Sequence, residues 1–306
     1  MAPGAPPPTT PPALTAPPIW DLLPAWRAAD RAARRASRRV EFAAFMDTYM
    51  GTYEAAVAGR KGPLFRRAFA VAAATGGGAS VASALAEGGE EEAAAAAEEP
   101  EASPAGGGGG GPTSDPVRVL DVGIGVAPNV EYYPPGALVT GVDPNPAMHP
   151  RAVANTHRRR PDIHLTLLPT VAAAAAAAAA ATGSPFDVAV CTLTLCSVGD
   201  PADLVAAAAA TLRPGGVFVF VEHVAAQVGD AALAGGVVEA VRRRAAQVLA
   251  APQHRVLADG CRLTQDAEAA VRRGAEWAAV EAERFWLEEA GMPLLSPHVA
   301  GMAVKG

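Results

Sequence analysis

The sequence predicts an α/β fold, in which helices cover both faces of a mostly parallel sheet. Short apolar runs rich in β-branched residues alternate with helical segments, as expected of strands buried on both sides. The first run, 117–122, ends in Gly123-x-Gly125, which is typical of a strand that passes through a tight turn into a helix. We therefore expect the main domain to span residues 117–306.

The chain before residue 117 divides into three parts by composition. Residues 1–20 are rich in Pro, Ala and Thr and lack the apolar core of a secretory signal. These residues fit either a disordered tail or an organelle transit segment, so the sequence does not predict the compartment of the protein. Residues 21–71 have helical periodicity and form a predicted N-terminal cap. Residues 72–116 contain glutamate, alanine and glycine tracts, and we expect a disordered linker because they can bury little apolar surface.

The predicted cap has two amphipathic stretches. In the first, a largely alanine face opposes five arginines, which fits a solvated helix and leaves open peripheral contact with an anionic membrane surface. In the second, aromatic residues and methionines recur at three- and four-residue steps, so we expect core packing and shielding of the mouth of a ligand site. This second stripe consists of Phe42, Phe45, Met46, Tyr49, Met50, Tyr53 and Val57.

Within the main domain, the apolar runs and their spacers define the expected elements. Ten consecutive alanines at 172–181 favour a helix through intrinsic propensity. The other expected helices lie at 146–159, 201–212 and 229–250, and the strands at 117–122, 138–143, 163–168, 186–193, 217–222, 277–286 and 298–304.

The turn after the first strand indicates a nucleoside site. Its two glycines let the backbone approach a ligand, and Asp143, 22 positions after Asp121, ends the next strand, where a carboxylate can accept hydrogen bonds from a ribose. A dinucleotide fingerprint needs a small residue at position 128, which here is Pro128. The acidic-x-Gly-x-Gly-x-Gly pattern of S-adenosylmethionine sites fits instead, with Ala127 in the last glycine position. We therefore predict S-adenosylmethionine as the cofactor.

Composition excludes several other classes. A net charge of −6 argues against nucleic acid as the main partner, and the absence of an apolar run of 18 residues predicts no transmembrane helix. The three cysteines suit a reduced compartment, and their spacing shows no zinc pattern. We expect buried thiols, surface histidines and no metal; the oligomeric state is not predicted.

Short motifs in a fixed order along the chain point to a known family. They are Gly123–Asn129, Tyr132–Gly136, Val142–Pro146, Cys191–Val198, Leu212–Gly216, Glu222–Val224, Asp259–Cys261 and Pro297–His298, with Arg60-Lys61 and Leu64-Phe65 upstream. In these residues the sequence resembles the class I S-adenosylmethionine-dependent methyltransferases, and more narrowly the methyltransferase-like protein 7 (thiol S-methyltransferase) family.

The resemblance implies a Rossmann-like sheet of seven strands with an antiparallel last strand, and an enzyme that methylates a small molecule, in this family at a thiol sulfur. It places Asp121, Gly123 and Gly125 at the methionine end of the cofactor. Asp143 would hold the ribose, and Pro144 would lie near the adenine. Thr192 and Leu193 would face the donor and the acceptor.

Three features leave alternatives open. Ala127 replaces the last glycine of the family pattern, and the alanine tract replaces a polar segment that contacts adenine in relatives. Relatives also tend to carry an apolar N-terminal anchor that this chain does not show. A C- or O-methyltransferase of a quinone or lipid precursor, and a non-catalytic protein that retains the fold, are the alternatives.

Catalysis of methyl transfer does not require a strong base if the acceptor is a thiol, because a few per cent is already thiolate at neutral pH. If a base exists, His223 is the first candidate, since it follows the fifth strand and the carboxyl ends of parallel strands face the site. A purely structural histidine remains the alternative. Asp259 and Cys261 are the next candidates.

Overall fold

The computed structural model describes residues 19–87, 115–172, 185–288 and 291–306. The predicted tail therefore lies outside the described residues except for its last two positions. The same holds for residues 88–114 of the predicted linker and for nearly all of the alanine tract, so these predictions remain predictions.

The described chain forms two units whose boundary falls inside the first helix, α1 (Ile19–Gly76). The first unit ends at Arg38, and the side chains of residues 31–38 are exposed. The second unit, Arg39–Gly306, contains the rest of α1 and the sheet. No helix within the described ranges has the length and apolar character needed to cross a membrane.

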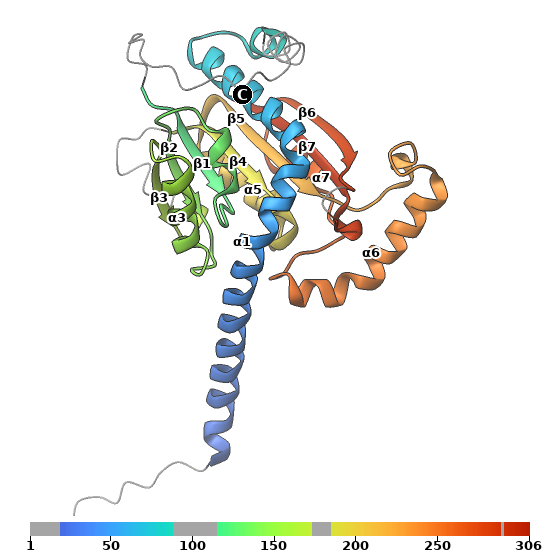
Figure 1. The fold of residues 1–306 in the computed structure, drawn as a ribbon. Coiled ribbons are helices and arrows are strands. Elements are labelled where there is room, and N and C mark those ends of the chain that lie inside the picture. The colour runs from blue at the N-terminus through green and yellow to red at the C-terminus, as the bar shows by residue number, and fades with distance from the viewer. Residues whose placement is uncertain (1–18, 88–114, 173–184, 289–290) are drawn as a thin grey trace, which may run out of the picture. The chain divides into compact units, whose positions relative to one another are not determined.

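The second unit is built on a seven-stranded sheet with the order β3-β2-β1-β4-β5-β7-β6 (Figure 1). Strands β1 to β5 pair in parallel, and β7 is antiparallel to both β5 and β6. The bounds are β1 Arg118–Val122, β2 Leu138–Val142, β3 His164–Leu168, β4 Phe186–Thr192, β5 Leu212–His223, β6 Trp277–Trp286 and β7 Pro297–Lys305. This confirms the predicted sheet, and strand order reverses between β1 and β4, which is where such folds bind ligands.

Helices alternate with the strands as expected, with two differences. The predicted helix at 229–250 is instead α6 (Val237–Leu257), because Gly235 and Gly236 both have positive φ and cannot continue a right-handed helix. The short helix α7 (Ala267–Gly274) was not predicted. The remaining helices are α3 (His149–Arg159), α5 (Pro201–Thr211) and the 3₁₀ turns η1 (Pro128–Tyr132), η2 (Leu195–Ser197), η3 (Val228–Asp230) and η4 (Pro293–Leu295).

The boundary predicted at residue 72 lies inside an ordered region. Helix α1 continues to Gly76, and residues 81–87 are helical again. Ala72 and Ala84 are both buried in the core cluster that covers one face of the sheet. Small apolar side chains thus pack within residues 72–87, where composition alone suggested a linker.

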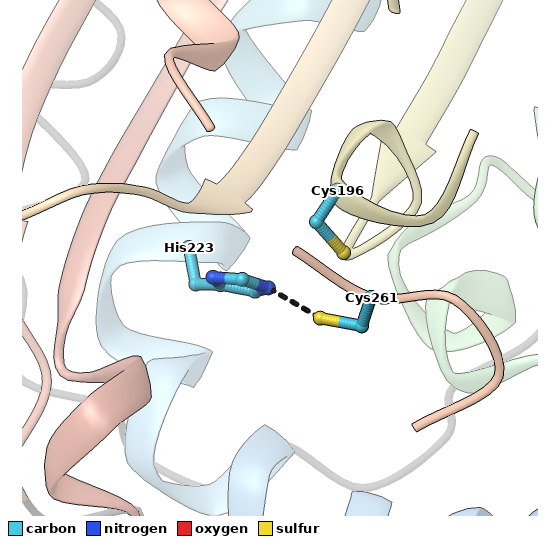
Figure 2. A group of neighbouring side chains, drawn as sticks. All are labelled: Cys196, His223 and Cys261. Carbon is cyan, nitrogen blue, oxygen red and sulfur yellow. Dashed lines mark hydrogen bonds between the residues drawn. The ribbon is translucent and has the colours of Figure 1, made fainter. Parts of the chain in front are cut away.

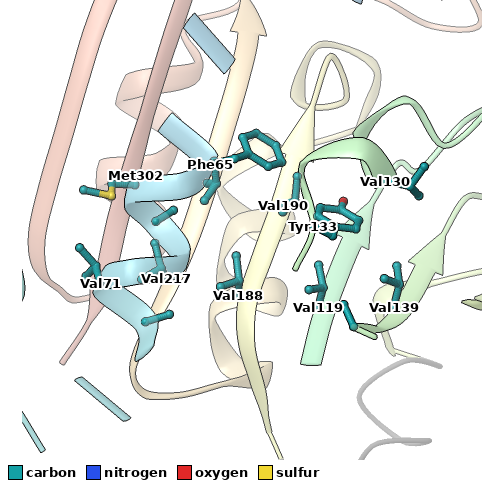
Figure 3. Packing of buried hydrophobic residues seen from close by; sticks show 14 of the residues in the cluster. Phe65, Val71, Val119, Val130, Tyr133, Val139, Val188, Val190, Val217 and Met302 are labelled. Carbon is teal, nitrogen blue, oxygen red and sulfur yellow. The ribbon is translucent and has the colours of Figure 1, made fainter. Parts of the chain in front are cut away.

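Alternate residues of the central strands serve two cores. Phe65 and Val71 of α1 belong to one buried cluster with Val119 and Val188 of the sheet, and Figure 3 shows Val71 beside Val217 of β5. The neighbouring strand positions face the other way and pack with α5 and α7; this second cluster includes Leu120, Ala189, Phe218, Val205 and Val271. Both faces are therefore covered by helices, which is why the strands are apolar throughout.

The aromatic and methionine stripe of α1 forms a third cluster. Met50, Tyr53 and Val57 are buried there with Phe285 of β6, which confirms the predicted core packing for these residues. Phe45 is 47% exposed, so the prediction fails at that position. Leu193, which follows β4, packs against the same cluster.

Gly301 in β7 lies in a region where the antiparallel strands leave no room for a side chain. A Cβ at this position would lie 2.2 Å from the backbone oxygen of Glu281 and 2.8 Å from the ring of Phe220. We expect Gly301→Ala to lower the free energy of unfolding by about 1–3 kcal/mol, because backbone or ring must shift, as measured by urea denaturation. Gly229→Ala is the control, since nothing lies within 4 Å of its added Cβ; equal losses in both variants would contradict the packing.

Candidate functional site

The candidate site lies where the carboxyl ends of β1, β2, β4 and β5 meet. Each loop begins with a backbone hydrogen bond to the neighbouring strand end. Gly123 donates to the carbonyl of Val142 at 2.7 Å, and Leu193 donates to the carbonyl of Val221 at 3.0 Å. The loops that follow the strands are therefore held side by side at one edge of the sheet.

The turn after β1 depends on two glycines. Gly123 and Gly125 have φ angles of 76° and 53°, which favour residues without a Cβ. A Cβ at Gly123 would lie 2.0 Å from the hydroxyl oxygen of Thr194, whereas a Cβ at Gly125 would have no neighbour nearer than 3.8 Å. Gly123 thus allows close packing, whereas a Cβ at Gly125 would meet only the backbone oxygen of Gly123 within 4 Å, at an ordinary contact distance.

Ala127 stands where the family pattern has its last glycine. Its φ of 59° is left-handed, so the methyl group costs about 1–2 kcal/mol of backbone strain. The residue is fully buried in the core cluster beneath the turn. The departure from glycine is therefore accommodated by core packing.

Asp143, directly after β2, closes the glycine turn from the other side. One carboxylate oxygen accepts a hydrogen bond from the Gly125 N–H at 3.1 Å, and the other accepts from the Asn145 N–H at 2.7 Å. Burial raises the pKa of Asp143, and the two backbone donors oppose this. A carboxylate can accept about four hydrogen bonds, so this one retains capacity for two more.

Asp121, on β1, is fully buried and anchors a polar network. Its carboxylate accepts hydrogen bonds from the Tyr133 hydroxyl at 2.6 Å and from the Asn129 side-chain amide at 3.2 Å. The same amide lies 3.1 Å from the hydroxyl oxygen of Thr192. Desolvation raises the pKa of Asp121 to about 6, although the two donors lower it.

The network joins two predicted site residues, Asp121 and Thr192, through residues that sequence reasoning did not assign. Asn129 and Tyr133 stood inside the motifs that carry the family resemblance, but nothing in their spacing indicated that they face Asp121. Pro144 is exposed, and its carbonyl accepts a hydrogen bond from Arg39 at 3.3 Å. Its predicted place beside the adenine, and that of Leu193 beside the donor, remain predictions.

A second group of buried polar side chains lies at the end of β5. His223 faces His298 across the β5–β7 pair, and both are buried, so the predicted surface location is wrong for these two histidines. His298 stacks on Tyr53 and Phe285 at ring-centroid distances of 5.8 and 5.3 Å. Burial lowers the pKa of His298 to about 3, which keeps it neutral at physiological pH.

Glu222, beside His223, is fully buried. One of its carboxylate oxygens accepts hydrogen bonds from the backbone N–H groups of Thr194 and Leu195, and burial raises its pKa to about 8. Some buried polar atoms in this region lack a hydrogen-bond partner among the described residues: Tyr53 Oη, Glu222 Oε2, His223 Nδ1 and His298 Nε2. In native proteins a buried polar group without a partner has a specific cause, such as a catalytic role, stored strain or a bound water or ion.

His223, the candidate base, makes its closest polar contact with a cysteine. Its Nε2 lies 3.1 Å from Cys261 Sγ, and Cys196 completes a buried triangle (Figure 2). Asp259 has a φ of 43° and pairs with Arg39 at 3.6 Å. The role of His223 as a general base remains a prediction.

Comparison with known proteins relates this chain to methyltransferases. Residues 82–273 match the family model described as "Methyltransferase domain". Thiol S-methyltransferase TMT1A of Homo sapiens is 33% identical over 196 residues, covering 63% of this chain and 72% of the relative. Thiol S-methyltransferase TMT1B of Rattus norvegicus is 32% identical over 193 residues with the same coverage. Among solved structures, an O-methyltransferase family protein from Burkholderia thailandensis has a TM-score of 0.44 and 13% identity, over 62% of this chain and 51% of that one.

The raised pKa of Asp121 predicts a pH dependence of stability. Because the folded-state pKa of about 6 lies above the usual aspartate value of 3.8, the stability associated with the protonated carboxyl is fully present near pH 4 and is lost as pH rises through 6. Relative to Asp121→Asn, the wild type should lose up to about 3 kcal/mol between pH 4 and 7. Urea denaturation at several pH values measures this difference; parallel profiles for the two proteins would contradict it.

Proposed function

Because the chain belongs to the methyltransferase domain family, we propose that it transfers the methyl group of S-adenosylmethionine to the sulfur of a small thiol. The observation that carries the choice of acceptor is the kinship with two proteins named thiol S-methyltransferases, at 32–33% identity over 72% of their length. The surroundings of the site support it independently.

The residues at the switch point fit the cofactor. The few neighbours of Gly125 and the spare acceptor capacity of Asp143 suit a nucleoside at this edge of the sheet. We assign the ribose hydroxyls to Asp143, the adenine to the region of Pro144, and the methionine end to Asp121 and the two glycines. When bound, the cofactor supplies a methyl carbon already activated by a positive sulfur.

The chain's own contribution is to hold the acceptor and exclude water. Met50, Tyr53 and Val57 of α1 bury the region beside Leu193, so that an acceptor there is shielded from solvent. Restricting two reactants to attack geometry can supply roughly 7–11 kcal/mol of the barrier. Orientation is therefore the main catalytic effect proposed for this fold.

The side of the site that we assign to the acceptor is largely aromatic. His298 stacks on both Tyr53 and Phe285, and it is uncharged because burial lowers its pKa to about 3. Such a surface suits a small, weakly polar acceptor and disfavours a charged one. A small thiol meets this description.

Asp143→Ala tests the assignment of the cofactor site. Loss of hydrogen bonds to a charged acceptor costs about 1.5–3 kcal/mol, so the affinity for S-adenosylmethionine should fall roughly 10- to 100-fold. Isothermal calorimetry on the full chain measures this. Asp203→Ala, at an exposed position of α5, should bind as the wild type does, and unchanged affinity in Asp143→Ala would refute the assignment.

The acceptor is tested with a matched pair of small molecules. An alkanethiol and the alcohol of the same carbon skeleton differ in the single atom that would receive the methyl group. Formation of S-adenosylhomocysteine, followed by chromatography, should require the thiol and be absent with the alcohol, since an alcohol is far less ionised at neutral pH. Turnover of quinols or phenols with no turnover of thiols would favour the C- or O-methyltransferase alternative.

A further inference from the structure

Three side chains of types that can bind a metal ion meet outside the glycine turn. Cys196 lies in η2 after β4, His223 is the last residue of β5, and Cys261 lies between α6 and α7. Figure 2 shows the three side chains directed toward one another from these separate segments. All are buried, with exposed fractions of 2%, 2% and 7% respectively.

Their spacing suits a tetrahedral ion. The three ligand atoms all lie within 4.8 Å of one another, and His223 Nε2 is 3.1 Å from Cys261 Sγ. Around zinc, with bonds of about 2.0–2.3 Å, neighbouring ligand atoms are roughly 3.6–3.8 Å apart. Side-chain adjustments of about an ångström would therefore bring the three atoms to zinc-binding distances.

The ligand set also satisfies the charge requirement of a buried site. Two thiolates balance the charge of a divalent ion, and a neutral imidazole adds none, so the ion with its three protein ligands is neutral; an acceptor thiolate would add one negative charge. Sulfur and imidazole nitrogen together select zinc over magnesium or calcium. His254, from α6, has its Nε2 3.3 Å from Cys261 Sγ and is placed to donate to that sulfur as a supporting residue.

We propose that Cys196, His223 and Cys261 bind one zinc ion and that its fourth position accepts the thiolate of the acceptor. The metal site stands on the geometry alone, whereas the identity of the fourth ligand rests on the proposed thiol methylation. On binding, the S–H bond breaks, a sulfur–zinc bond forms, and the proton leaves to bulk water. The oxidation state of zinc does not change.

This arrangement gives the buried triangle a role beside the cofactor site. A coordinated thiol is deprotonated at neutral pH, and coordination also fixes the position of its sulfur. Cys196 lies three residues after Leu193, on the same loop that we place beside the donor. His223 is then a ligand rather than a general base.

Metal content tests the site directly. The full chain, purified in a phosphine reductant without chelators, should contain about one zinc ion by elemental mass spectrometry. Cys196→Ser and Cys261→Ser should weaken zinc binding by more than the 10- to 100-fold typical of losing a supporting residue. Cys191→Ser is the matched control, because Cys191 is equally buried and lies outside the triangle; its zinc content should equal that of the wild type.

Absence of zinc from the folded wild type, or equal zinc content in all three serine variants, would overturn the metal site. Circular dichroism and thermal unfolding of each variant establish that it is folded. His254→Ala tests whether the fourth position of the ion is free for the acceptor or is filled by His254. Loss of zinc in that variant as complete as in Cys261→Ser would show a fourth protein ligand and overturn the open position.

Cobalt substitution tests the fourth ligand without any turnover. In the Co²⁺-loaded chain, adding an alkanethiol should increase the sulfur-to-cobalt charge-transfer absorbance, whereas the matching alcohol should not. No change with the thiol would overturn the proposed coordination. Thiol methylation that persists undiminished in zinc-free Cys196→Ser would overturn the role of the metal and leave the proposed function intact, so the two can fail separately.

Discussion

The site depends on a carboxylate that the sheet buries completely. Asp121 has no contact with solvent, so its oxygens must be satisfied by protein donors, and Tyr133 and Asn129 supply them. Both donors lie in or next to η1, directly after the glycine turn. Satisfying one charge therefore fixes the path of the chain from β1 through the turn, and the Asn129 amide extends the constraint to Thr192 on β4.

Helix α1 is coupled to that same segment by a second buried charge. Lys61 is 1% exposed and pairs with Glu54 at 2.6 Å, and the Tyr132 hydroxyl donates to the same carboxylate at 3.0 Å. The lysine also lies 5.1 Å from the centre of the Tyr132 ring. Removing one member of such a buried pair leaves the other charge buried and unpaired, which lowers the free energy of unfolding by several kcal/mol. The helix that shields the acceptor side is thus positioned relative to the turn that we assign to the donor.

Much of the fold follows from local sequence. The strand from Phe186 was predicted from an apolar run, and the sheet order reverses at the turn that the glycines indicated. Composition failed where small side chains decide the packing: Ala72 and Ala84 are core residues within a stretch that looked like a linker. Likewise, Gly235 and Gly236 delay α6 through backbone geometry, which a search for apolar periodicity does not register.

The candidate site divides in the same way. Gly123, Gly125 and Asp143 could be identified because they lie in one continuous strand–turn–strand pattern. Asn129 and Tyr133 could not, because their role depends on which side of the turn they face. The three proposed zinc ligands could not be recognised either, because they lie far apart in the sequence. Cys196 and His223 are 27 positions apart, and His223 and Cys261 are 38 apart. Spacing rules detect ligands that share a helix or a loop, and these three share neither.

The register of β4 against β5 brings the two halves of the site together. Thr192 pairs with Val221, so β5 extends two residues beyond β4 and carries His223 past the strand end where Leu193 turns away. The loop from Leu193 to Cys196 is held against β5 because the backbone N–H groups of Thr194 and Leu195 donate to Glu222. The buried carboxylate of Glu222 thereby fixes the distance between the strand end that we place beside the donor and the cysteine that we assign to zinc. A shift of one residue in this register would turn His223 to the opposite face relative to β4, and the triangle with Cys196 would be lost.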